Sequence, residues 1–254
     1  MPGIGQLGAG LLDRSAVLAW AAHHPYARFA LARAARVDGL VADGGLLLLA
    51  RTETGLVGHG LGDPAAVDDL FARALAAGRL EGARWVNLPR RSTASIPSGF
   101  ALNDHWDFRW ITAPVPPQPG QDRVVPLGAD DASAINGLLD VAFPSSMVRP
   151  GHPIARGWLG VWSGPTLVAC AADRSTQSPD PTAVPVGVIG GVATHPEHRR
   201  QGLAAAVTAT LTEQLQARYG LVTLGVIAGN DTASRMYERL GFTGLLEITS
   251  IRPA

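Results

Sequence analysis

The segment His198–Ala204 combines the residue types that bind a phosphate group. Arg199 and Arg200 stand just before Gly202, where an apolar stretch ends and a helical pattern begins. The first N–H groups of a helix have no partners within the helix and attract anions. Glycine lets a ligand approach the backbone closely, and arginine adds positive charge. We therefore predict an anion site here, suited to a phosphate or a pyrophosphate.

A second group of residues with chemical potential lies further along the chain. Asn230, Ala233 and Tyr237 are spaced i, i+3 and i+7, which places them on one face of a helix. Asp231 can cap the start of this helix, and Gly241 can end it. We expect Asn230 and Tyr237 to point toward the end of the strand that precedes the helix.

Regular elements must position these two groups. Val186–Thr194 is apolar and β-branched with small residues between, as in a strand that is covered on both faces. Val222–Ile227 is the next expected strand. A strand, a crossover helix and another strand in succession imply a parallel pair. The crossover helix is predicted to reach Arg218 and has an apolar residue at every fourth position, namely Leu203, Val207, Leu211 and Leu215.

Together these motifs resemble the GNAT superfamily of acyl-CoA-dependent N-acyltransferases. Arg199-x-x-Gly202-x-Ala204 matches the family signature, in which Gln or Arg is followed at these spacings by Gly and by Gly or Ala. Asn230–Phe242 is similar to the family's later Asn-x-x-Ala-x-x-Leu-Tyr-x-x-Leu-Gly-Phe element. The likeness covers roughly 186–242. It implies an α/β (α+β) fold of GNAT type, with a mixed central sheet flanked by helices.

The resemblance also implies how acetyl-CoA would be held as co-substrate. The helix start and the two arginines would hold the pyrophosphate, and the end of the strand would hydrogen-bond the pantetheine arm. The N–H of Val192 would polarise the thioester carbonyl and stabilise the oxyanion, and Tyr237 would donate to the departing thiolate. The cofactor-binding residues implied in this way are Val192, Ala193, Thr194, Arg199, Arg200, Gln201, Gly202, Leu203, Ala204, Asn230, Ala233 and Tyr237.

The general base is left open by the sequence. Many relatives carry a glutamate on the central strand or on the next one, whereas the matching stretches here contain no carboxylate. An alkyl ammonium with a pKa near ~10.4 must lose a proton before it can attack at pH 7. His152, His195, Asp140 or a chain of water molecules could accept that proton.

Composition excludes several classes of chemistry and partner. Lys+Arg and Asp+Glu each number 21, so the net charge is zero and we expect neither nucleic acid nor an anionic membrane as partner. All 21 basic residues are arginines, which excludes lysine Schiff-base chemistry. The single cysteine, Cys170, excludes an intramolecular disulfide and a multi-cysteine metal site, and we expect it to be a small core residue.

The sequence also gives expectations on the setting of the protein. It has no apolar run of membrane-spanning length and no pattern of a secretory signal. We therefore expect a cytoplasmic enzyme that needs no metal and is a monomer or a homodimer. Its acceptor would be a small-molecule or peptide amine.

The chain divides into two expected domains. Residues 1–112 form an N-terminal lobe, 113–122 a proline-rich linker, and 123–254 the GNAT domain. The element order of the first lobe resembles a GNAT fold without its cofactor motif, which suggests a degenerate repeat. Its one glycine-rich turn leads to Asp63, which we interpret as a helix N-cap and not as part of an anion site.

Individual elements can be predicted in both domains. Residues 1 to about 38 are expected to be helical, and a helix is expected to open at Asp130 and Asp131. A hairpin is predicted around Ser163-Gly164-Pro165, and Ser175–Pro185 is predicted to be a loop. The other expected strands are Leu46–Ala50, Trp85–Leu88 and His105–Ile111.

Three functions are compatible with these observations. The first is an active N-acyltransferase that uses acetyl-CoA. The second is a cofactor-binding sensor or pseudoenzyme, which the missing strand carboxylate would favour. The third is an unrelated nucleotide-binding module, which would use the same anion turn.

Overall fold

The computed structural model describes residues 11–175 and 184–254, and their contacts divide the chain into two compact units. Unit 1 contains the described residues up to Trp106, Val184 and Leu246–Ala254, and unit 2 contains 107–175 and Pro185–Leu245. Two strands, β5 (Phe100–Ile111) and β11 (Gly244–Pro253), have residues in both units.

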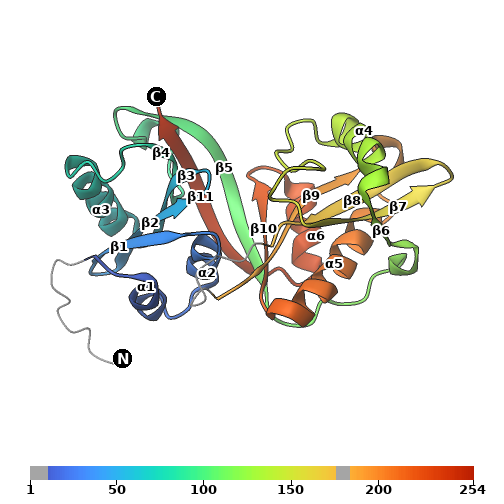
Figure 1. Ribbon diagram of the computed structural model, residues 1–254, viewed down its shortest axis with the longest axis horizontal. Helices are drawn as coiled ribbons and strands as arrows, with labels where there is room; N and C mark the ends of the chain where they lie inside the picture. Colours follow the sequence, from blue (N-terminus) through green and yellow to red (C-terminus); the bar gives the residue numbers. More distant parts are fainter. Residues whose placement is uncertain (1–10, 176–183) are drawn as a thin grey trace. The chain divides into compact units, whose positions relative to one another are not determined.

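Unit 1 begins with two short helices, and a longer third helix lies beside its strands (Figure 1). The elements are α1 (Arg14–Trp20), α2 (Pro25–Leu31), β1 (Arg36–Ala42), β2 (Gly45–Thr52), β3 (Gly55–Gly62), α3 (Pro64–Ala76) and β4 (Ala83–Pro89). The sheet order in this unit is β1-β2-β3-β4-β11-β5. The pairs β1–β2 and β2–β3 are antiparallel, whereas α3 connects β3 to a parallel β4.

The leucine run of β2 explains how unit 1 builds its core. Successive strand residues point to opposite faces of the sheet, so a continuous apolar run is buried on both sides. Leu47 and Leu49 pack with Val67, Leu70 and other residues of α3. The intervening leucines of the run pack on the other face with residues of α1 and α2.

Unit 2 repeats the plan of antiparallel strands followed by a parallel crossover. Its elements are β6 (Val125–Leu127), α4 (Ala132–Ala142), β7 (Gly157–Ser163), β8 (Thr166–Asp173), β9 (Gly187–Thr194), α5 (Leu203–Tyr219), β10 (Val222–Ile227) and α6 (Asp231–Arg239). The sheet order is β10-β9-β8-β7-β6, with the end of β5 beside β10. α5 joins β9 to β10, which are parallel.

Two apolar clusters hold the helices of unit 2 against the sheet. One contains the predicted stripe of α5 together with Tyr237, Leu240 and Phe242 from α6 and the turn after it. The other contains Ile135 and Leu139 of α4, together with residues of β7 and β8. The sheet is therefore covered on both faces, as the mixed GNAT-type architecture requires.

Most of the expected elements are confirmed. The hairpin β7–β8, the parallel pair β9–β10 and the helix α5 lie where the patterns placed them. Asp63 is a helix N-cap, and its Oδ1 atom accepts from the N–H groups of Ala65 and Ala66 at 3.0 Å each. Most of the loop expected at 175–185 lies outside the described residues, as does the start of the N-terminal helical stretch.

Three features differ from the sequence expectations. The N-terminal helical stretch is two helices interrupted at Ala22 and His23, whose φ angles of 46° and 55° are left-handed, and it is followed by an unforeseen strand, β1. The helix α6 is capped by Asn230 and not by Asp231, because Asn230 lies outside the helix and its Oδ1 atom accepts from the Ala233 N–H at 3.2 Å.

The third difference concerns the ends of the second domain. The last strand, β11, pairs with β4 from Ile248↔Pro89 to Ile251↔Val86, so its residues from Leu246 belong to unit 1. The proline-rich stretch packs on α5: Val115 is buried, and the Gln216 side chain donates to the Ala113 carbonyl at 2.6 Å. The division between the units falls within β5, at Trp106.

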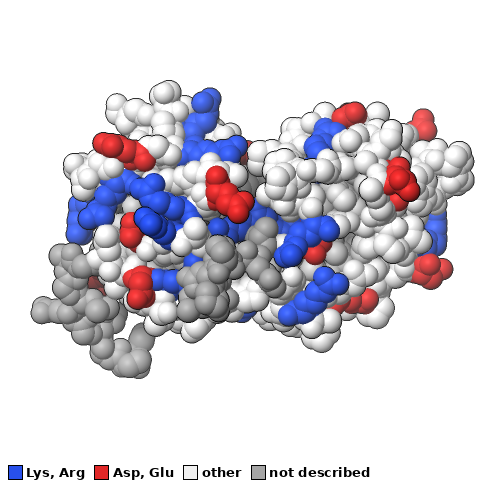
Figure 2. Space-filling model, viewed as in Figure 1, with Lys and Arg blue, Asp and Glu red and all other residues white. Residues whose placement is uncertain are grey.

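Charged side chains are interspersed on the visible face of the molecule (Figure 2). Every blue side chain there is an arginine, since the chain has no lysine. None of the described helices is long and apolar enough to cross a membrane. The described residues also contain no group of three or more His, Cys, Asp or Glu side chains placed to share a metal ion.

Candidate functional site

The strands β9 and β10 separate at the middle of unit 2. Their ladder has three pairs, Val222↔Gly187, Thr223↔Val188 and Leu224↔Ile189, and no further pair joins these two fully described strands. The other edge of β9 stays on β8 as far as Ala169↔Thr194. Beyond Ile189, β9 thus has a backbone edge that β10 does not cover. An extended ligand can hydrogen-bond to such an edge as an added strand would.

A β-bulge lies at the start of this uncovered edge. Cys170 pairs with Ala193 and Ala172 with Gly190, so Gly191 and Val192 of β9 lie opposite one residue of β8. Gly191 has a φ of 58°, in the left-handed region that favours glycine. A Cβ atom at Gly191 would also lie 2.9 Å from the Trp158 ring.

Cys170 supports the bulge from inside the core. Its Sγ lies 3.5 Å from the Gly191 carbonyl oxygen, to which it donates. The side chain is fully buried, and burial raises the pKa of the thiol to about 12. Cys170 is therefore a protonated core residue, as expected, and is not placed to act as a nucleophile.

The helix α5 starts with backbone N–H groups that no side chain caps. Its N-cap is Gly202, with a φ of 77°, and the first bond across the turn runs from the Ala206 N–H to the Gly202 carbonyl. Arg200, two residues earlier, also has a left-handed φ, of 63°. A Cβ atom on Gly202 would meet nothing within 4 Å, so the space beside the helix start is open. These features suit an anion at the start of α5.

The residues around this helix start supply further partners. The exposed Arg199 donates through Nε to the Thr194 carbonyl at 3.5 Å, which links the turn to the end of β9. The hydroxyl oxygen of Thr194 is buried and has no hydrogen-bond partner among the described residues. A buried polar atom of this kind is costly unless a ligand satisfies it. The site therefore fits a ligand that has an anionic end and a polar arm along β9.

The helix α6 brings Tyr237 into the same apolar cluster as Val192. Tyr237 is 6% exposed, and its ring meets Phe242 edge to face with 6.0 Å between centroids. Val192 and Ala233 pack, partly buried, against this cluster. Burial raises the pKa of Tyr237 above its ordinary value, so the hydroxyl stays protonated. Because the Oδ1 atom of Asn230 caps the helix, its amide N–H groups are the part that can face a ligand.

Comparisons with known proteins identify the fold. A family model described as FR47-like protein, a GNAT-related family, matches residues 180–250. The structure of a GNAT-family acetyltransferase from Novosphingobium aromaticivorans is similar with a TM-score of 0.54 and 25% identity, over 81% of this chain and 88% of that chain. This protein has the GNAT fold.

A second solved structure supports the same fold. It is a GCN5-related N-acetyltransferase from Sphaerobacter thermophilus, with a TM-score of 0.53 and 17% identity, over 85% of this chain and 79% of that chain. No curated protein matches the sequence. The GNAT likeness supports acyl transfer as the general chemistry.

Within this GNAT fold, the three side chains considered as general base are already engaged. The Nδ1 atom of His152 accepts from the Ile154 N–H at 3.2 Å, and that of His195 accepts from the Glu197 N–H at 3.4 Å. Asp140 forms an ion pair with Arg149 at 2.7 Å. Each of the three side chains thus already has a partner among the described residues.

The roles of two arginines of unit 2 were not predicted from the sequence. Arg109 of β5 is 4% exposed and joins Glu238 at 2.9 Å and the Phe242 carbonyl at 3.3 Å, which fixes the end of α6 beside Tyr237. Arg149 organises the loop after α4. Neither has a local motif, because their partners lie on other elements. The Gly190-Gly191 pair inside a strand pattern could have indicated the bulge.

Proposed function

We propose that this protein transfers an acetyl group from acetyl-CoA to an amine by direct attack within a ternary complex. The observation that carries the proposal is the separation of β9 and β10 beside an uncapped helix start. The first feature offers a backbone edge to the pantetheine arm, and the second offers N–H groups to the pyrophosphate. The proposed cofactor-binding residues are those named above, from Val192 to Tyr237.

The chemistry requires one bond to form and one to break. The neutral amine attacks the thioester carbonyl carbon, a carbon–nitrogen bond forms, and the carbon–sulfur bond then breaks to release the thiolate. The Val192 N–H donates to the carbonyl oxygen, where negative charge develops. The proton lost by the amine passes to water or to a histidine, and the thiolate is finally protonated to give the free thiol of CoA.

Tyr237 would act as a hydrogen-bond donor to the departing sulfur. A tyrosine of ordinary pKa, about 10, is already a weaker acid than a thiol near ~8.5, so full proton transfer is uphill by roughly 2 kcal/mol. Burial raises the pKa of Tyr237 further and makes that transfer less favourable. Stabilisation of the thiolate by a shared proton, with transfer late in the step, is the role that these values support.

An amine panel tests the proposed function. The purified chain is incubated with acetyl-CoA and representative amines, and release of the free thiol is followed together with the mass of the acetylated product. Turnover of at least one amine, with loss of turnover in Gly202→Asp, is the expected result. Binding of acetyl-CoA without turnover of any amine would contradict the enzyme assignment and favour a sensor. Binding of ATP or NAD in preference to acetyl-CoA would contradict the ligand assignment.

A further inference from the structure

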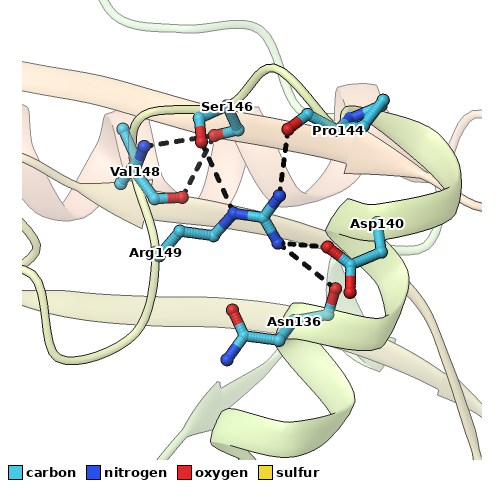
Figure 3. Close-up of polar contacts among 6 residues, drawn as sticks. All are labelled: Asn136, Asp140, Pro144, Ser146, Val148 and Arg149. Carbon is cyan, nitrogen blue, oxygen red and sulfur yellow. Dashed lines mark hydrogen bonds and ion pairs between the residues drawn. The ribbon is translucent and has the colours of Figure 1, made fainter.

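The loop between α4 and β7 is held together by one arginine side chain (Figure 3). Arg149 donates through Nη1 to the Asp140 carboxylate at 2.7 Å and to the Asn136 carbonyl at 3.5 Å. It also donates to the carbonyl oxygens of Pro144, at 3.1 Å, and Ser146, at 3.4 Å. One guanidinium thus joins the last turns of α4 to the loop that follows. We call residues 143–149 the clamped loop.

The clamped loop also has internal bonds that fix Val148. The Ser146 hydroxyl donates to the Val148 carbonyl at 3.0 Å and accepts from the Val148 N–H at 3.2 Å (Figure 3). Both residues are buried, whereas Met147 between them is 67% exposed. Arg149 and Ser146 together set the position at which the Val148 side chain enters the core.

Val148 packs onto the bulge of β9. A Cβ atom added at Gly191 would lie 3.5 Å from the Val148 Cβ and 2.9 Å from the Trp158 ring, so both side chains cover that glycine. Val148 and Trp158 belong to the cluster on the α4 face of the sheet, whereas Val192 packs toward the α5 face. The clamped loop therefore covers the backbone immediately before the N–H proposed as oxyanion donor, from the α4 face.

We infer that Arg149 is a positioning residue for the acyl-transfer step, acting through Val148 on the Gly191–Val192 bulge. The inference rests on the proposed function. A displacement of about 1 Å at a reacting centre can cost on the order of 10²-fold in rate, so a clamp on this loop is expected to have a large kinetic effect. Among the described residues, the hydrogen bonds of Arg149 go to α4 and the clamped loop and not to α5 or the anion turn. Binding of the CoA phosphates should therefore be independent of Arg149.

The same four contacts separate this role from base catalysis by Asp140. If Asp140 only completes the clamp, its loss removes one of the four bonds that Arg149 makes. The Asp140 side chain is 66% exposed, and an exposed ion pair of this kind contributes about 1 kcal/mol or less. Asp140→Asn should then lower kcat/KM for the amine by about fivefold at most. Arg149→Ala removes all four bonds. Arg149→Lys keeps the charge but loses the planar fork that reaches several oxygens at once.

The experiment compares these three variants with the wild type. We expect Arg149→Ala to lower kcat/KM for the amine by about 10²-fold, Arg149→Lys to recover little of that loss, and any loss of acetyl-CoA affinity to be much smaller than the loss in kcat/KM, because the phosphate contacts remain. A wild-type kcat/KM in Arg149→Ala would overturn the inference. So would an Asp140→Asn enzyme that is as impaired as Arg149→Ala and has lost the acidic limb of its pH profile, since Asp140 would then be the base.

A second measurement keeps the inference testable without turnover. Hydrogen exchange of the Ser146 and Val148 amides should become about tenfold faster in Arg149→Ala, while the amides of α5 keep their protection. Unchanged exchange would overturn the positioning role even if no amine is found. Failure of the wild type to acetylate any amine, with the exchange effect present, would instead overturn the proposed function.

Discussion

The two units contain the same strand–helix–strand crossover, and they differ at the start of the helix. In unit 1 the Asp63 carboxylate accepts from two N–H groups of α3 and occupies the place of an anion. In unit 2 the corresponding position of α5 is Gly202, which has no side chain to offer and leaves those groups to a ligand. A glycine at the N-cap costs a helix only a few tenths of a kcal/mol relative to aspartate, so α5 leaves its first N–H groups open at little cost in stability.

The two parallel strand pairs differ in what lies at the end of the ladder. In unit 1 the ladder of β3 and β4 has an irregularity between Leu56 and Val57 and ends at His59↔Asn87, where the Tyr26 hydroxyl lies 3.0 Å from His59 Nδ1. All three side chains are buried. In unit 2 the ladder ends at Ile189, and a bulge follows. One topology thus serves as a filled scaffold in unit 1 and as a candidate site in unit 2.

The largest expected effect comes from giving unit 2 the helix start of unit 1. Gly202→Asp would place a carboxylate beside the N–H groups and repel the pyrophosphate, so we expect the affinity for CoA to fall by at least about 10³-fold. Titration calorimetry measures this. A wild-type Kd in the variant would show that the anion site lies elsewhere.

Gly202→Asn is the matched control for that change. Asparagine has nearly the same shape as aspartate, tolerates the left-handed φ of 77° better than other side chains, and carries no charge. We expect it to weaken CoA binding much less than aspartate does. Equal losses in both variants would assign the effect to backbone strain and not to charge.

The next largest effect is expected on kcat, from the loss of the Tyr237 hydroxyl. Unit 1 contains a buried tyrosine, Tyr26, that has no proposed catalytic role. Tyr237→Phe keeps the ring packed against Phe242, so stability and the Kd for acetyl-CoA should change little. Loss of one donor to a developing charge typically costs about 10²–10³ in kcat. Single-turnover kinetics measure the loss directly. An unchanged chemical step would make Tyr237 a core residue comparable to Tyr26.

A smaller effect is expected on the pH dependence of stability, through the buried His59 of unit 1. Burial lowers the pKa of His59 to about 3, below the value of about 6.5 in an unfolded chain. Between these values the unfolded state binds one more proton, so the free energy of unfolding falls with acidification, by at most about 1.4 kcal/mol per pH unit. Above pH 6.5 His59 is neutral in both the folded and the unfolded state, so its titration no longer lowers the free energy of unfolding.

His59→Gln should remove this dependence from unit 1. Chemical denaturation at pH 4 to 7 would show a flatter stability curve for the variant, and hydrogen exchange would place the change in β3 and β4. A curve parallel to the wild type would mean that His59 is not the titrating group. Tyr26 and Asn87, which face His59, do not titrate in this range.

The smallest effect is expected at the cap of unit 1. Asp63→Ala should lower stability by about 1 kcal/mol through the loss of two bonds to α3. It should not create a second CoA site, because the buried side chains of Tyr26, His59 and Asn87 fill the end of the β3–β4 ladder. Calorimetry should give one CoA per chain in both proteins. Two sites in the variant would contradict the proposal that only unit 2 binds CoA.

The elements around the candidate site could be predicted from the sequence. Period and turn chemistry predicted β9, α5, β10 and the Asp63 cap, since each depends on residues that are close in sequence. The strand β1 was missed because its Gly39 interrupts the β pattern, and only the structure shows why: a Cβ atom there would lie 2.4 Å from Val17.

Features that depend on distant residues could not be predicted. The end of the β9–β10 ladder and the bulge depend on pairing with β8, and the roles of Arg109 and Arg149 depend on partners from other elements. The cap of α6 was placed one residue too late because Asn230 and Asp231 are both good caps, and the local backbone angles decide between them.

The buried thiol behind the bulge has a consequence for the protein's sensitivity to oxidation. The proposed reaction would release CoA as a free thiol, and the Gly191 carbonyl of the proposed site accepts from the Cys170 thiol. Burial raises the pKa of Cys170 to about 12 and leaves the side chain no exposed surface, so the reactive thiolate is disfavoured. The protein's only cysteine is thereby protected from forming a mixed disulfide with oxidised CoA.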